Sequence, residues 1–135
     1  GMQRDLVLRW LEQLRLLIAR VVRGERDAGT ELAEMEVDQA LGRLLGGAGA
    51  LVDRLDPPSA AALLGDPYRV FGYAEALALK SALVKARGGP PAEVAALVAR
   101  SLALAKEAIR RCPDPPPGWS EWLAAAEADV VQPPS

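Results

Sequence analysis

Residues 66–111 read DPYRVFGYAEALALKSALVKARGGPPAEVAALVARSLALAKEAIRR, two long apolar-rich segments on either side of the turn GGPP. Leucine, valine and alanine recur at intervals of three and four in both segments, which is the spacing of a helix with an apolar side. Prolines suit the first turn of each helix, and the glycines of the turn suit a helix end. The sequence therefore predicts a helical hairpin, with one helix from Pro67 to about Arg87 and a second that ends at Arg111.

The first of these helices is apolar or small almost all the way round, which is typical of a central helix that is covered on several sides. Glu75 and Lys85 interrupt this pattern, and so does a stripe of three cations and a phenol: Arg69, Tyr73, Lys80 and Arg87. Such a stripe could bind an anionic ligand or an acidic peptide. Alternatively, it is the solvated edge of the helix, with long cationic side chains that reach water. The sequence leaves both interpretations open.

The second helix has a charged stripe and an apolar side. We expect the stripe to face solvent and the apolar side to pack on the core. The stripe holds Glu93, Arg100, Glu107 and Arg111, and the apolar side holds Val94, Leu97, Val98, Leu102, Leu104 and Ile109.

Residues 4–23 have a pattern that predicts a long amphipathic helix ending near Gly24. One broad arc of this helix is apolar: Leu6, Val7, Trp10, Leu11, Leu14, Leu17, Ile18, Val21 and Val22. The segment carries five arginines against Asp5 and Glu12, a charge of +3, so the remainder of the chain is at −5 because the whole sums to −2. This asymmetry favours adhesion to the body of the same chain, or to a second copy, over a membrane surface or phosphate groups.

Four large side chains are candidates for an interface between two copies of the chain. Leu8 and Leu16 lie on the polar side of the first helix, away from its apolar arc, and Trp119 and Trp122 lie near the C-terminus. The tryptophans have a second interpretation, in which the Pro-rich stretch before them is a rigid spacer that returns them to the body of the chain.

Short breaks divide the rest of the chain into further helices. We expect a helix from Thr30 with Val37, Leu41 and Leu44 as its apolar stripe, and the breaks GGAG (46–49), DPP (56–58) and GDP (65–67) after it. Residues 112–118 predict a Pro-rich linker, Ser120 the cap of a last short helix, and residues 132–135 a frayed tail. Gly1 before Met2 is interpreted as a tag remnant. The sequence thus predicts a single all-α domain over 2–135, with about seven helices arranged as hairpins.

The composition argues against several classes of function. The 135 residues include no histidine and a single cysteine, Cys112, so histidine-activated nucleophiles, zinc–cysteine clusters and an internal disulfide are excluded. The net charge of −2 gives no argument for nucleic-acid binding, and no apolar run reaches the roughly 20 residues that a membrane span needs. We predict no catalytic residues, no cofactor and no metal. A lone cysteine fits a cytoplasmic protein best.

Two resemblances add to this interpretation. Residues 66–111, with VFGYAEAL in the first helix and spaced alanines in the second, resemble a tetratricopeptide-type helical pair, although both helices are too long for a 34-residue repeat and no second copy is visible. The resemblance implies a tetratricopeptide-like α–α superhelix, with an irregular bundle as the alternative. Glu12, Gln13, Leu14, Ile18 and Ala19 match a pattern with which a family of short bacterial helical proteins opens, and that family implies a shared fold without an established activity.

The sequence leads to a non-enzymatic helical scaffold or protein-interaction module, with a protein partner or a second copy of itself. The alternative is a regulatory protein that binds a small molecule or an anion at Arg69, Tyr73, Lys80 and Arg87. The binding surface would lie on a different part of the molecule in each case.

Overall fold

The computed structural model describes residues 29–131, together with Asp5, Leu8, Arg9, Glu12, Gln13, Arg15, Leu16 and Ala19 of the first segment. Within these residues the chain is helical and has no strand, which confirms the all-α class. The elements are α2 (Gly29–Leu45), the 3-10 turn η1 (Gly46–Ala48), α3 (Gly49–Val52), α4 (Pro57–Leu64), α5 (Pro67–Ala86), α6 (Pro91–Arg111) and α7 (Pro117–Val131). The apolar arc of residues 4–23, Gly1 and the tail 132–135 lie outside the described residues.

The predicted number of about seven helices is not confirmed. Residues 29–131 hold five helices of eight residues or more, whereas α3 is a single turn of four residues. The eight described residues of the first segment are all helical, at the positions where the sequence predicts a helix.

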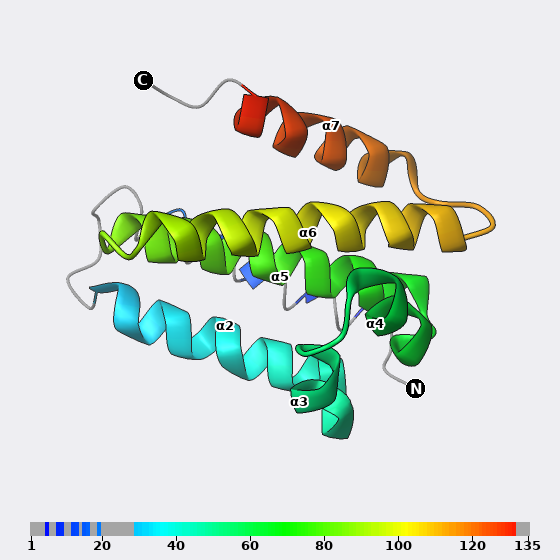
Figure 1. Ribbon diagram of the computed structural model, residues 1–135, viewed down its shortest axis with the longest axis horizontal. Coiled ribbons are helices and arrows are strands. Elements are labelled where there is room, and N and C mark those ends of the chain that lie inside the picture. Colours follow the sequence, from blue (N-terminus) through cyan, green and yellow to red (C-terminus); the bar gives the residue numbers. More distant parts are fainter. Residues whose placement is uncertain are drawn as a thin grey trace.

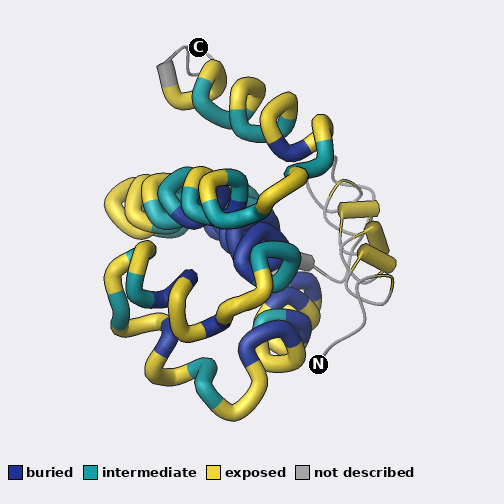
Figure 2. The backbone as a smooth tube through the Cα atoms, turned by 90° about the vertical axis from the view of Figure 1, so that its right-hand side faces the viewer, coloured by how far each residue is buried: buried dark blue, intermediate teal, exposed yellow. Residues whose placement is uncertain are grey.

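Helix α5 is the centre of the structure. Figure 1 shows α2, α5, α6 and α7 stacked in that order, with α3 and α4 at one end of the stack. From Val70 to Leu77 every residue of α5 is buried, as its uniformly apolar sequence predicts. Figure 2 shows this buried stretch inside a layer of half-buried and exposed helices.

The breaks between the helices follow the predicted chemistry. Asp56 accepts a hydrogen bond from the backbone N–H of Ser59 at the start of α4, and Asp66 accepts one from Tyr68 at the start of α5. In both helices a proline follows the capping aspartate, where its fixed φ fits the first turn.

The corner between α5 and α6 leaves no room for a side chain. Gly88 has a φ of +75°, in the left-handed region that favours glycine. The N–H of Gly89 donates to the carbonyl oxygen of Val84 over 2.8 Å, and a Cβ added to Gly89 would lie 2.6 Å from Cγ1 of Val84. The antiparallel course of α5 and α6 therefore depends on this pair of glycines.

The prediction for the last helix was wrong in its start and its length. Helix α7 begins at Pro117 and has 15 residues, so the linker is shorter than the predicted 112–118 and Ser120 lies inside the helix rather than at its cap. The reason is that proline is well suited to the first position of a helix, where no backbone N–H is needed. The N–H of Trp119 donates to the carbonyl oxygen of Pro116 over 3.1 Å and closes this first turn.

Two glycine substitutions should show that the corner between α5 and α6 tolerates a side chain less well than an ordinary helical site does. Gly89→Ala should lower the free energy of unfolding by about 1–3 kcal/mol, because its Cβ clashes with Val84. Gly42→Ala, inside α2 with no atom within 4 Å of the new Cβ, should raise it by about 0.5–1 kcal/mol. Urea unfolding followed by circular dichroism measures both, and equal effects would contradict the tight corner.

Candidate functional site

Three cations of the predicted stripe on α5 bind groups of α2, although Lys80 and Arg87 stay partly exposed to solvent. Nε and Nη2 of Arg69 donate to the carbonyl oxygen of Leu44 over 2.8 and 2.6 Å, at the C-terminal end of α2. Lys80 pairs with Asp38 over 2.9 Å, and Arg87 pairs with Glu34 over 2.8 Å. The stripe holds α2 against α5, and the acidic side chains of α2 neutralise two of its charges.

Tyr73, the fourth residue of the stripe, belongs to a separate buried network. Its side chain is 0 % exposed, and its hydroxyl donates to Oδ1 of Asp53 over 2.5 Å. Nε of Arg100 donates to the same hydroxyl over 3.1 Å. The four predicted ligand residues therefore do not form one surface. This arrangement favours the structural role of the stripe.

The prediction that Arg100 faces solvent was wrong. Its Nη1 and Nη2 donate to the carbonyl oxygens of Leu55 and Val52, each over 2.7 Å. These carbonyls lie where α3 ends, and such groups need donors because no further helical turn follows. Arg111, on the same stripe, donates to the carbonyl oxygen of Pro58 in α4. The stripe thus faces α3 and α4 over part of its length.

The network holds Tyr73 in its neutral form. Burial and the hydrogen bond to Asp53 raise the pKa of Tyr73 to about 12, against the opposing effect of Arg100. A phenol with this pKa does not act as a nucleophile or a base near neutral pH. The arrangement therefore positions α6 against α3.

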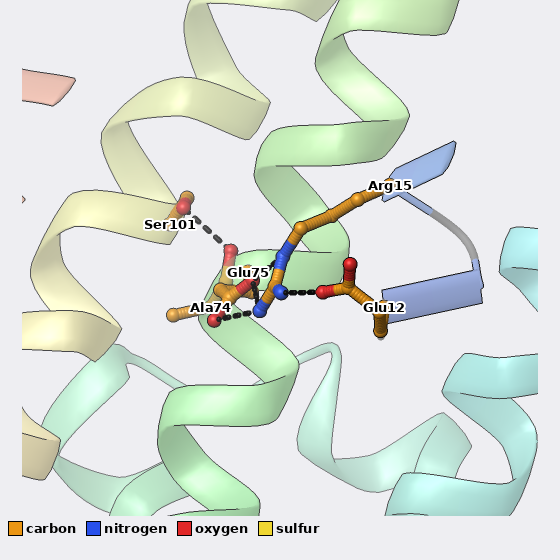
Figure 3. Close-up of polar contacts among 5 residues, drawn as sticks. All are labelled: Glu12, Arg15, Ala74, Glu75 and Ser101. Atoms are coloured by element: carbon orange, nitrogen blue, oxygen red, sulfur yellow. Dashed lines mark hydrogen bonds and ion pairs between the residues drawn. The ribbon is translucent and has the colours of Figure 1, made fainter. Parts of the chain in front are cut away.

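The ion pair between Arg15 and Glu75 joins the first segment to α5. Figure 3 shows the guanidinium of Arg15 against the carboxylate of Glu75, with Glu12 on its other side. Nε of Arg15 lies 2.9 Å from Oε2 of Glu75, and Nη2 lies 2.9 Å from Oε1 and 2.7 Å from Oε2. The side chain of Glu75 is 8 % exposed. Burial alone would lower the pKa of Arg15, but the hydrogen bonds and charge of Glu75 raise it above its ordinary value.

The sequence did not predict this pair, although it held a signal for it. Glu75 is the single acidic residue of α5, and it lies in the most apolar part of that helix. A buried carboxylate requires a partner, and arginine is the residue that binds carboxylates through two parallel hydrogen bonds. Which of the arginines in the chain is the partner depends on how residues far apart in sequence pack.

A groove with a volume of about 990 Å³ lies between α5, α6 and α7. Small and apolar side chains line it, among them Ala82, Val94, Val98, Leu102, Trp122 and Val130, and Lys85 and Asp129 lie exposed at its border. Val94, Val98 and Leu102 belong to the side of α6 that was predicted to pack on the core, but the structure leaves them half-buried. The groove is thus an apolar surface without a full covering among the described residues.

The hydroxyl groups within the groove are already engaged. Ser81 donates to the carbonyl oxygen of Ala78, and Ser101 donates to that of Ala74, each over 2.6 Å. The groove therefore offers few polar groups to a ligand, and its affinity would come from apolar contact.

The four predicted interface residues have different surroundings. Trp119 is 8 % exposed and stacks on Phe71 with ring centroids 4.5 Å apart, so its assignment to an intermolecular interface was wrong. Trp122 contacts Phe71 edge-on at 5.4 Å and lines the groove. Both tryptophans thus pack on the body of the chain, because Phe71 offers them an apolar ring. Leu8 and Leu16 are 49 % and 59 % exposed, and their role at an interface stays a prediction.

Residues 29–131 and the described positions of the first segment contain no group of three or more acidic or cysteine side chains that could hold a metal ion. No helix in the same part of the chain is long and apolar enough to cross a membrane.

No protein-family model matches the chain, and neither does any curated protein or solved structure. The resemblances to a tetratricopeptide-type pair and to short bacterial helical proteins therefore stay predictions that rest on the residues quoted for them.

Substitutions on α5 test whether its stripe is structural. Arg69→Ala should lower the free energy of unfolding by about 2 kcal/mol, because the carbonyl of Leu44 loses a charged donor. Lys80→Ala removes a largely exposed ion pair and should cost about 0.5 kcal/mol. Inorganic phosphate, added at constant ionic strength, should leave the Tm of the wild type unchanged. A rise in Tm that Lys80→Ala abolishes would restore the ligand-binding interpretation.

Alkaline unfolding tests the buried phenol. The pKa of Tyr73 is about 12 in the folded chain and 10.0 ordinarily, so its contribution to stability is complete below about pH 10 and is lost as the pH rises toward 12. In Tyr73→Phe, the free energy of unfolding should fall less steeply above about pH 10, by up to about 1.4 kcal/mol per pH unit. Urea unfolding at a series of pH values gives both curves. Parallel curves for the two proteins would contradict the burial of a neutral Tyr73.

Proposed function

We propose that this chain is a non-enzymatic protein-interaction module that binds an amphipathic helix in the groove between α5, α6 and α7. The observation that supports the proposal is the apolar lining of the groove, about 990 Å³ in volume, on three helices. This volume falls in the usual range of binding pockets and accommodates several large aliphatic side chains.

The spacing of the lining residues favours a helical partner. Ala78, Ala82 and Lys85 follow one another at intervals of four and three on α5, and Val94, Val98 and Leu102 follow at intervals of four on α6. Ala78 and Ala82 thus form a short apolar row on α5, with Lys85 at its end, and the residues of α6 form a second apolar row. Two rows with a hollow between them accept the apolar side of a third helix. Several lining residues are alanines, which allow the backbone of a partner to approach closely.

The tetratricopeptide-like interpretation fits this proposal. In tetratricopeptide-like proteins, helical pairs bury one side and present a concave face to a partner. The pair α5–α6, with α7 as a third wall, would use its groove in the same way. Exposed Leu8 and Leu16 support self-association as part of the same function.

The alternative function has less support. An anion bound at Lys80 and Arg87 would have to displace the carboxylates of Asp38 and Glu34. Tyr73 would have to leave a buried position to reach the same ligand. We therefore place the binding surface on the opposite side of α5 from α2.

Two alanines of α6 provide a matched test. Ala99 lines the groove, whereas Ala96, also exposed and three residues earlier, does not. A labelled amphipathic helix of leucine, alanine and glutamine is titrated with the full chain, and fluorescence anisotropy reports binding. Ala99→Glu should weaken binding at least about tenfold, because it buries a charge under an apolar partner. Ala96→Glu should leave affinity within about twofold of the wild type. Failure of both the wild type and the variant Arg15→Glu to bind the helix, or equal losses in the two alanine variants, would overturn the proposed function.

A further inference from the structure

The contact of Arg15 places the first segment beside the groove. Glu75, the partner of Arg15, lies on α5 seven residues before Ala82, a lining residue. Seven residues are nearly two full turns, so these two positions differ by only about 20° around the helix. Ala78, also in the lining, stands one turn after Glu75 on the adjacent row. The carboxylate that holds Arg15 is therefore at the border of the groove.

The described residues of the first segment identify its outward side. The residues that are helical and exposed are Asp5, Leu8, Arg9, Glu12, Gln13, Arg15, Leu16 and Ala19. At 100° per residue, these positions fall within one arc of about 160°. The sequence places nine apolar residues, from Leu6 to Val22, on the opposite arc. The exposed residues of the segment thus belong to the polar side that the sequence pattern gives it.

The charges of the two parts are complementary. Residues 4–23 carry +3, and the remainder of the chain carries −5. Arg15 stands at the edge of the exposed arc, next to the apolar arc, which is the position from which a long side chain reaches inward. Among the described residues, the guanidinium of Arg15 donates three hydrogen bonds to the carboxylate of Glu75. The pair thus fixes the first segment at one register along α5.

We propose that the occupant of the groove is the chain's own segment 4–23, which the ion pair between Arg15 and Glu75 holds in register, and that a partner helix binds by displacing it. The inference rests on the proposed function, because it fills the same groove. It adds a preference to the proposed function: among helices with one apolar side, the groove favours one with an arginine placed to meet Glu75. The segment is a built-in competitor, and its removal exposes both the apolar rows and the carboxylate.

Charge reversal in the full chain tests the assignment. The peptide of residues 4–23, labelled for anisotropy, is titrated with the wild type, Arg15→Glu and the control Arg9→Glu, which changes an exposed arginine of the same segment. Arg15→Glu repels the segment from Glu75 and frees the groove, so this chain should bind the peptide at least about tenfold more tightly than the wild type. Arg9→Glu should stay within about twofold of the wild type. Equal affinities of all three chains would overturn the inference.

The reciprocal change tests the register. The Glu75→Arg chain should prefer a peptide that carries Arg15→Glu over the unaltered peptide. The Arg15→Glu chain, which keeps Glu75, should have the opposite preference. If Glu75→Arg fails to fold, Glu75→Gln replaces it and should bind both peptides with equal affinity, because no charge remains to select between them. A Glu75 variant that keeps the preference of the Arg15→Glu chain would overturn the role of the ion pair.

A double variant and a comparison peptide distinguish failure of this inference from failure of the proposed function. If Ala99→Glu, combined with Arg15→Glu, leaves binding of the peptide undiminished, the segment does not occupy the groove and this inference fails. If the leucine–alanine–glutamine helix binds normally in the same series, the proposed function survives that failure.

Sedimentation equilibrium shows whether the segment that fills a groove belongs to the same chain or to a second copy. A wild-type dimer that Arg15→Glu converts to monomers would assign the segment to the groove of a second copy and overturn the assignment within one chain.

Discussion

The burial of α5 is the constraint on which the rest of the structure depends. Every residue from Val70 to Leu77 is buried, so each polar group in that stretch must be satisfied by a neighbouring element. The hydroxyl of Tyr73 is satisfied by Asp53 and Arg100, and the carboxylate of Glu75 by Arg15. Leaving a buried group of this kind unpaired costs more than its hydrogen bond contributes. The polar residues of α5 therefore determine which neighbours can pack on it and in which register.

Each side of α5 uses a different polar contact for this purpose. Toward α2, Arg69 and Lys80 reach the carbonyl of Leu44 and the carboxylate of Asp38. Toward α6, the hydroxyl of Ser101 donates to a carbonyl of α5 itself. Toward the first segment, the contact is the ion pair of Glu75, and Figure 3 shows Ser101 and Arg15 approaching neighbouring residues of α5 from two directions. Apolar burial drives these helices together without selecting a direction, so the polar contacts give the arrangement its specificity.

The sequence predicted what local chemistry decides. Aspartate–proline starts, glycine ends and the helical period located α4, α5 and α6 to within a residue or two, because these signals act within one or two turns. The incorrect assignments concern Arg100 and Trp119, whose surroundings are residues far away in sequence. An arginine on a charged stripe looks solvated until the carbonyls of α3 are placed beside it. A tryptophan after a Pro-rich linker looks available for a partner until Phe71 is placed beneath it. The candidate site was the least predictable part, because it consists of surface that three helices leave uncovered.

The groove follows from the way in which α7 is attached. Its first turn is anchored, since Trp119 packs between Phe71 and Tyr68. Toward its C-terminal end α7 diverges from α6, as Figure 1 shows. An exposed ion pair between Lys106 and Glu127 joins the two helices. An exposed ion pair contributes little, so α7 is held firmly at one end only. Helix α6 has more apolar surface than α5 alone covers, and the divergence of α7 leaves the rows of Val94 and Val98 half-buried. The buried polar groups of the central helix α5 all have partners, whereas the apolar surface of its neighbour α6 is only partly covered. The free apolar surface therefore lies on α6, and a further helix that packs there buries the most apolar area.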